Sequence, residues 1–163
     1  MKKHVFFCSC LLILCLLFSA CANKNGSTVN ETRTGGLQDP IAQYLRVGSG
    51  MGPGNPVCTV ILSRLELEQY SDNYNRQAYG NIEYIDAIAK YSDRYFIDNF
   101  LVIVLLEENS GSNRHKVESV NRNGDIIIKR LIPEIGTSDM ATWNIIIELN
   151  NNFKQEKFQV VLR

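Results

Sequence analysis

The spacing of apolar and polar residues changes about halfway along the chain, from helical to strand-like. A run rich in β-branched residues begins at Val57 and has the length of a strand. Ser63 and Glu66 then match a capping box, in which the serine accepts from the Glu66 amide and the carboxylate reaches back to the Ser63 amide. The pattern therefore predicts a strand at 57–63 and then a helix that runs to about Tyr74.

Two further helical segments are predicted before the remaining strands begin. Residues 92–99 favour a short turn of helix with Ser92 as its N-cap. A longer helix is predicted after the Gly80-Asn81 break, where apolar residues recur every three or four positions: Ile82, Ile85, Ile88 and Ala89.

From Phe100 onwards the pattern is that of strands. Residues 100–106 contain no polar side chain, which indicates a central strand that is covered on both faces. Segments 115–121 and 125–132 flank Asn123-Gly124, a pair that accepts the positive φ values of a two-residue hairpin turn. Pro133 ends the second of these strands, because it has no amide to donate to a ladder.

The end of the chain predicts two more strands, at 142–149 and 157–163. Alternation in the first of them places Trp143 on the same face as three aliphatic residues, so the indole is expected in the core. Helices that come first and strands that come later are typical of the α+β class. We expect one domain at 41–163, an antiparallel β-sheet of about five to six strands with two to three helices packed on one face.

The first residues predict a lipoprotein leader. Lys2 and Lys3 precede an apolar stretch that ends in Ser19-Ala20-Cys21. This ending resembles a bacterial lipobox. The resemblance implies a signal peptide at 1–20, cleavage before Cys21 and fatty acyl groups such as palmitate on that cysteine, which would anchor the chain at the extracytoplasmic face of the cell membrane.

The segment after the cysteine is polar. Residues 21–40 are rich in Asn, Thr, Ser and Gly and predict a flexible tether between the anchor and the domain. The alternative is an uncleaved N-terminal helix that spans the membrane, for which the stretch from Val5 to Ala22 is barely long enough.

Loss of the leader changes the charge and the cysteine count. Removing Lys2 and Lys3 lowers the basic side chains from 17 to 15, against 17 acidic ones, and no basic patch is evident, so nucleic acid is not an expected partner. Of five cysteines, only Cys58 lies beyond the lipidated position. It cannot form an intramolecular disulfide, and its β-branched neighbours favour a buried, inert thiol.

The sequence offers little for catalysis. The glycine-rich stretch at 47–56 is interrupted by prolines and precedes a strand, unlike a nucleotide-binding loop. His115 is the one histidine after the leader, whereas a zinc site usually draws on several His or Cys ligands. Glu107 and Glu108 point to opposite faces of a strand and are interpreted as solvated charges at its end. We expect no catalytic residue, no metal site and no cofactor.

The most informative segment joins two apolar strands. The five-residue polar loop at 109–113 leaves its backbone amides accessible and is followed by Arg114, whose guanidinium suits a carboxylate. The loop at 134–140 is a second exposed segment. An ordinary hairpin loop is the alternative to a binding site. Candidate partner-binding residues are Ser110, Gly111, Ser112, Asn113, Arg114, His115, Asp139 and Met140.

Residues 95–150 carry a resemblance to a known family. The order of the apolar strand, the Ser110-Gly111-Ser112 loop, the Gly124-Asp125 turn, Pro133 and the Trp143 strand resembles the PrcB C-terminal domain of Firmicute extracytoplasmic proteins. That resemblance implies a subunit that stabilises a protease complex, with a distant likeness to chagasin-type inhibitors. Where those relatives have Thr-Gly-Gly-Tyr, this chain has Ser110-Gly111-Ser112-Asn113, without the aromatic residue.

Together these patterns predict a non-catalytic, lipid-anchored protein that binds or stabilises another envelope protein through loops 109–115 and 134–140. A solute- or glycan-binding lipoprotein is the alternative, and a hydrolase that depends on His115 is a third. A glycan receptor would need exposed aromatic side chains, for which the sequence offers Tyr70, Tyr74, Tyr79 and Tyr84.

Overall fold

The structure is a computed structural model that describes residues 40–48, 54–75 and 82–163. The predicted leader, Cys21, the tether and Tyr79 lie outside the described residues. Elements follow one another in the order β1 (Ile41–Gly48), β2 (Val57–Ile61), α1 (Arg64–Asn75), α2 (Ile82–Ala89), α3 (Tyr95–Asp98), β3 (Asn99–Glu108), β4 (Arg114–Val120), β5 (Asp125–Leu131), β6 (Ala141–Asn150), the 3-10 turn η1 (Asn151–Phe153) and β7 (Gln159–Leu162).

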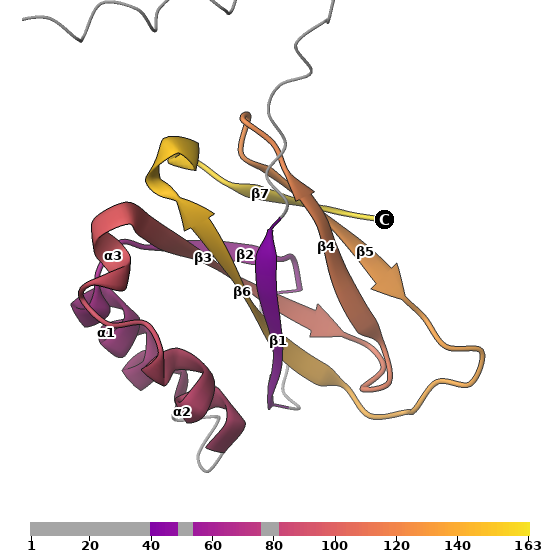
Figure 1. Cartoon of the computed structure of the whole chain (residues 1–163). Coiled ribbons are helices and arrows are strands. Elements are labelled where there is room, and N and C mark those ends of the chain that lie inside the picture. Colours follow the sequence, from indigo (N-terminus) through magenta and orange to yellow (C-terminus); the bar gives the residue numbers. More distant parts are fainter. Residues whose placement is uncertain (1–39, 49–53, 76–81) are drawn as a thin grey trace, which may run out of the picture. The chain divides into compact units, whose positions relative to one another are not determined.

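The strands form two sheets (Figure 1). Sheet I has the order β1-β6-β3-β2, and all its neighbouring strands are antiparallel. Sheet II has the order β4-β5-β7, in which β4 and β5 are antiparallel and β5 and β7 are parallel. The long strands β3 and β6 lie at the centre of sheet I and are paired along their whole length.

Two apolar clusters lie on the two faces of sheet I. Alternate residues of β3 and β6 face sheet II and pack against its inner side chains: Phe100, Val102, Val104, Leu106, Trp143, Ile145, Ile147 and Leu149 against Val117, Val120, Ile126, Ile128 and Phe158. The intervening residues face the helices: Leu101, Ile103 and Ile146 contact Leu67, Tyr70, Tyr84, Ile88 and Tyr91. Because both faces are covered, β3 is the central, wholly apolar strand that the sequence predicts.

The broad α+β class is confirmed, and the sheet arrangement differs from the expected one. The strands divide into two facing sheets instead of one, and β7 pairs with β5 in parallel, so the arrangement is not wholly antiparallel. The described residues also contain β1, a strand at Ile41–Gly48 that the sequence did not predict. As an edge strand of mixed polarity, β1 lacks the alternation that marks a half-buried strand.

The helices lie close to the predicted positions, but their N-terminal caps differ in part from the predicted ones. Ser63 Oγ accepts from the Glu66 amide at 3.1 Å as expected, but the Glu66 carboxylate accepts from the Leu62 amide at 2.6 Å and not from that of Ser63. The N-cap of α3 is Arg94, without a side-chain cap, so the assignment of that role to Ser92 was wrong. The Ser92 carbonyl accepts from the Tyr95 amide at 2.9 Å, and the Ser92 amide donates to the Lys90 carbonyl at 3.2 Å.

The buried side of α2 also differs from the predicted stripe. Tyr84 and Ile88 are buried, followed by Tyr91, whereas Ile85 and Ala89 are exposed. A stripe chosen from aliphatic residues alone overlooked Tyr84, which lies one helical turn before Ile88, and Tyr91, which follows the end of the helix.

The β4–β5 hairpin is present but its turn is longer than predicted. The Asn121 amide donates to the Asp125 carbonyl at 3.0 Å, which leaves three residues between them instead of two. Gly124 has φ of +85° and closes the turn through its amide to the Asn121 carbonyl. This geometry matches a three-residue hairpin loop with glycine in the left-handed region.

The register of sheet I defines two ends of the domain. Ile41 pairs with Glu148 at the end where the described chain begins, and Gly48 pairs with Thr142 at the end that carries the β3–β4 and β5–β6 connections. None of the helices in the described part of the chain has the length and apolar character needed to cross a bilayer.

Candidate interaction surface and its buried support

Two loops far apart in sequence meet at one end of the domain. The β3–β4 loop at 109–113 and the β5–β6 loop at 132–140 are joined by hydrogen bonds; we call them together the loop platform. The Gly111 amide donates to the Asp139 carbonyl at 2.7 Å, and the Thr137 amide donates to the Ser110 and Ser112 hydroxyls at 3.0 and 3.2 Å. The two loops predicted to bind a partner therefore form one surface.

An ion pair from β1 stabilises the loop platform. Arg46 Nη2 lies 2.5 Å from Asp139 Oδ2, and hydrogen bonds from Thr137 and Arg46 lower the pKa of Asp139 to about 2. Gly111 packs directly against this pair. A Cβ at position 111 would collide with the Asp139 carboxylate, so glycine is the residue that fits this contact.

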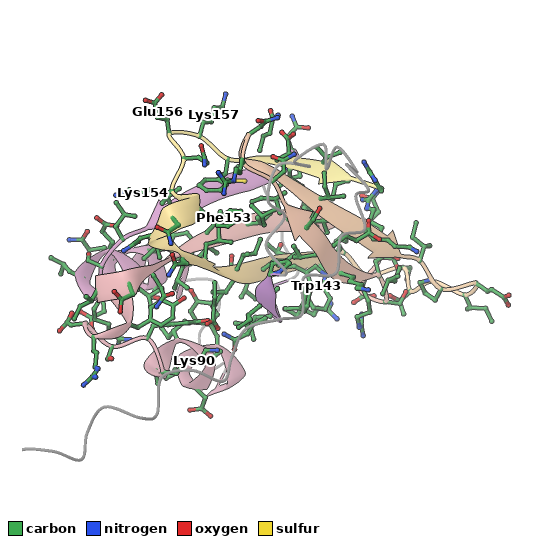
Figure 2. All side chains as sticks on the ribbon, turned by 45° about the horizontal axis from the view of Figure 1, so that its top comes forward. Lys90, Trp143, Phe153, Lys154, Glu156 and Lys157 are labelled. Carbon is green, nitrogen blue, oxygen red and sulfur yellow. The ribbon has the colours of Figure 1, made fainter. Side chains whose placement is uncertain are left out.

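The β5–β6 loop exposes aliphatic side chains. Ile132 is 69% exposed and Ile135 is 88% exposed, and Leu131 and Met140, at the two ends of the connection, are also exposed. Figure 1 shows this connection extending past the β3–β4 loop before it returns to β6, and in Figure 2 its side chains extend outward from the ribbon. Clustered exposed aliphatic residues on a protruding loop are typical of an interaction site.

A buried carboxylate lies beneath the loop platform. Glu108 is only 1% exposed and accepts four hydrogen bonds. Arg130 donates two of them in a fork, from Nε to Oε1 at 2.8 Å and from Nη2 to Oε2 at 2.9 Å. His115 Nε2 lies 2.9 Å from Oε1, and Asn113 Nδ2 donates to Oε2 at 2.8 Å. The interpretation of Glu108 as a solvated charge was wrong: it ties the ends of β3, β4 and β5 together.

Burial, hydrogen bonds and nearby charges together set the protonation states of this cluster. Burial raises the pKa of Glu108, but the bonds from Arg130, His115 and Asn113 outweigh it and lower the pKa overall. Burial lowers the pKa of His115, and the nearby Arg130 and Arg114 charges add to this despite the Glu108 carboxylate. His115 is therefore neutral at pH 7 and donates to Glu108 from Nε2.

The depressed pKa of His115 predicts a loss of stability in mild acid. The unfolded chain takes up a proton near pH 6.5, whereas the folded chain does so only at lower pH, so the free energy of unfolding falls as pH drops below about 6.5, by at most about 1.4 kcal/mol per pH unit. The check is urea unfolding at a series of pH values. His115→Gln keeps a side-chain N–H donor but does not titrate, and should remove this dependence; an unchanged pH profile in that variant would contradict the assignment.

The structure divides the predicted partner-binding residues into two groups. Arg114, Asp139 and Met140 are exposed, and Ser110 and Ser112 are half-buried. Gly111, Asn113 and His115 are buried. The last two are hydrogen-bonded to Glu108 and lie below the surface, beneath the loop platform.

Arg114 and Trp143 connect the loop platform to the core. Arg114 Nη1 donates to the Gly111 and Asn113 carbonyls at 2.9 and 3.0 Å, and its guanidinium lies 5.3 Å from the Trp143 ring centroid. Trp143 itself is buried among the residues between the sheets, which confirms the core position predicted from its alternation. In Figure 2, Trp143 lies on the side of the projecting β5–β6 loop, and Phe153 and Lys154 lie toward the opposite end.

Sequence reasoning missed four residues of this region. Ile132 ends the predicted strand before Pro133 and Ile135 lies in the predicted loop after it, and aliphatic residues on both sides of a proline were a signal that could have been used. Arg46 and Arg130 gave no local signal, because each meets its carboxylate partner across a long sequence separation.

In the described part of the chain, several residues that the alternative functions would require are buried or lack partners suited to the chemistry. Tyr70 and Tyr84 are buried, so they are not the exposed aromatic side chains that a glycan receptor needs. Burial raises the pKa of Cys58 to about 11, which keeps the thiol protonated at neutral pH. Among the described residues there is no group of three or more His, Cys, Asp or Glu that could hold a metal ion.

The loop platform is thus defined by contacts among described residues: two hydrogen-bonded loops, an ion pair from β1 and a buried carboxylate beneath them. The chain matches no protein-family model, no curated protein sequence and no solved structure.

Proposed function

We propose that this chain is a lipid-anchored, extracytoplasmic binding protein that stabilises or modulates another envelope protein through the loop platform. Acyl groups on Cys21 hold it at the cell membrane, and its action requires no catalytic residue. The resemblance of residues 95–150 to the PrcB C-terminal domain suggests a protease as the class of partner.

The observation that carries this proposal is the exposed aliphatic tip of the β5–β6 loop. Two isoleucines that are more than two-thirds exposed cost free energy in water, and their burial in a partner would return about 1.5 to 3 kcal/mol for each side chain. Buried aliphatic anchors at the centre of an interface with a polar rim are typical of protein–protein contacts. The hydroxyls of Ser110, Ser112 and Thr137 beside the tip supply such a rim.

The support beneath the tip favours binding by a preformed surface. Hydrogen bonds between the two loops, the Arg46–Asp139 ion pair and the fourfold contacts of Glu108 fix the backbone before a partner arrives. A surface that is already ordered loses less conformational entropy on binding, which increases affinity.

The test is photo-crosslinking in intact cells. A benzoylphenylalanine at Met140 is expected to join the protein to one partner, which mass spectrometry identifies. Ile132→Ser together with Ile135→Ser should reduce this crosslink at least tenfold, because about 3 kcal/mol or more of apolar burial is lost.

A matched control comes from the helices. Ile97 of α3 is 70% exposed, so Ile97→Ser makes the same chemical change on another part of the domain. It is expected to leave the crosslink intact. Equal crosslinking by the double variant and the wild type, or turnover of a small substrate by the purified protein, would refute the proposal.

A further inference from the structure

The outer face of sheet II carries a row of three cations. Lys116 of β4 pairs directly with Lys129 of β5. Arg163 follows β7, and it lies opposite Lys129 because its amide donates to the Ile128 carbonyl and its carbonyl accepts from the Arg130 amide, at 2.9 and 2.8 Å. Neighbouring strands are about 4.8 Å apart, so three positive charges stand side by side across the sheet.

Within the described residues, no ion pair neutralises these charges. All three side chains are exposed, and the ion pairs found in the described part of the chain involve none of them. Glu118 is the one acidic residue of β4, against Arg114 and Lys116. Like charges directly opposite each other destabilise a sheet, so this arrangement opposes folding stability and requires another explanation.

Apolar side chains flank the cation row on the same face. Ile127 pairs with Val161 on one side of the row, and Leu131 lies on the other side, opposite Arg114. Val161 and Leu131 are exposed, and Ile127 is partly exposed. Asp125 also lies on this face, beyond Ile127, where its carboxylate accepts from Asn121 and Gln159. Around the three cations, the face combines a cationic centre with aliphatic margins, which is the composition that binds the headgroup region of an anionic bilayer.

We propose that the outer face of sheet II docks on the anionic surface of the membrane to which the protein is anchored. The inference rests on the proposed lipid anchor, because a tethered domain is present at a high effective concentration and three cations then suffice. With this face on the membrane, the strands lie parallel to the bilayer. The loop platform at the far end from Ile41 then faces a neighbouring protein in the same membrane.

The test uses the full-length protein reconstituted in vesicles of phosphatidylcholine alone or of phosphatidylcholine and phosphatidylglycerol in equal parts. An amine-reactive reagent labels exposed lysines, and peptide mapping gives the rate at each site. Labelling of Lys116 and Lys129 is expected to fall about tenfold in the anionic vesicles and to recover at high salt. Lys90, between α2 and α3 on the helical side of sheet I, is the control and should change little.

One variant separates docking from folding. Lys129→Glu places a carboxylate between Lys116 and Arg163, so it should restore the labelling of Lys116 in anionic vesicles while it maintains or raises the melting temperature. Arg94→Glu, an exposed site outside sheet II, should leave the protection intact.

Three results would overturn the inference. The first is equal labelling in the two kinds of vesicle, and the second is protection that survives in Lys129→Glu. The third is protection of Lys116 and Lys129 by soluble polyglutamate but not by anionic vesicles, which would indicate an acidic protein partner. Flotation with neutral vesicles reports the lipid anchor separately. A protein that does not float has lost the anchor of the proposed function, whereas one that floats without protection has lost only the docking face.

Discussion

Replacing Arg130 with methionine is expected to lower the free energy of unfolding by about 3 kcal/mol. The arginine fork supplies two of the four hydrogen bonds to the Glu108 carboxylate, which is only 1% exposed. Without it, a buried negative charge retains only the neutral donors of His115 and Asn113. The arginine side chain is itself 35% exposed, so water can replace part of the contact and the loss falls at the low end of the range for buried pairs.

Urea unfolding of Arg130→Met beside Lys129→Met provides the measurement and its matched control. Lys129 is the preceding residue of β5, points to the opposite face and opposes another lysine, so its loss should change stability by less than about 0.5 kcal/mol or raise it. Glu108→Gln combined with Arg130→Met removes both charges and should cost less than the sum of the single changes. Equal effects of the two methionine variants would show that Glu108 does not depend on Arg130.

Replacing Trp143 with alanine is expected to cost about 3 to 5 kcal/mol. Its indole is buried between the sheets opposite Leu106, its ring centroid is 5.4 Å from that of His115, and the Arg114 guanidinium lies over it. Alanine would leave a cavity where β3, β4 and β6 meet beneath the loop platform. Because Trp143 is the single tryptophan, far-UV circular dichroism replaces fluorescence as the unfolding signal.

Trp143→Phe is the control for the alanine variant, since it keeps an aromatic ring in the same space and should cost less than half as much. Partner crosslinking from Met140 should survive in the phenylalanine variant. A Trp143→Ala protein that unfolds like the wild type yet loses its partner would contradict a core position, and would make the indole a contact residue instead.

The helices and most of the strands could be predicted because their signals are local. The wholly apolar segment at Phe100–Leu106 and the alternation around Trp143 each require only neighbouring residues. The division into two sheets could not be predicted in the same way. It depends on which face of β3 meets which strand of sheet II, and on the parallel pairing of β7 with β5, neither of which leaves a local pattern.

The candidate site shows the same limit. The polar loop at 109–113 is evident from its composition, and its contact with 132–140 is not, because the joining bonds run between backbone groups and short hydroxyls. Glu108 looks like an ordinary charge at a strand end. Only the fold brings Arg130, 22 positions later in the sequence, into contact with Glu108. In the folded chain Glu108 is a buried carboxylate that connects the strand ends beneath the two loops. The cation row is likewise formed by register, from residues that are widely spaced in the chain.

The register of β1 also has a mechanical meaning. β1 begins at Ile41, beside Glu148, and Arg46, near its other end, forms an ion pair with Asp139 of the loop platform. In the proposed arrangement, with the N-terminus anchored and a partner on the loop platform, a pull between the two would run along β1. The hydrogen bonds between β1 and β6 are perpendicular to that pull, so they would be loaded in shear and would have to break together. A pull across the strands would instead break them one after another. A domain built this way resists force that is applied along β1, which is the direction of the load in the proposed anchored arrangement.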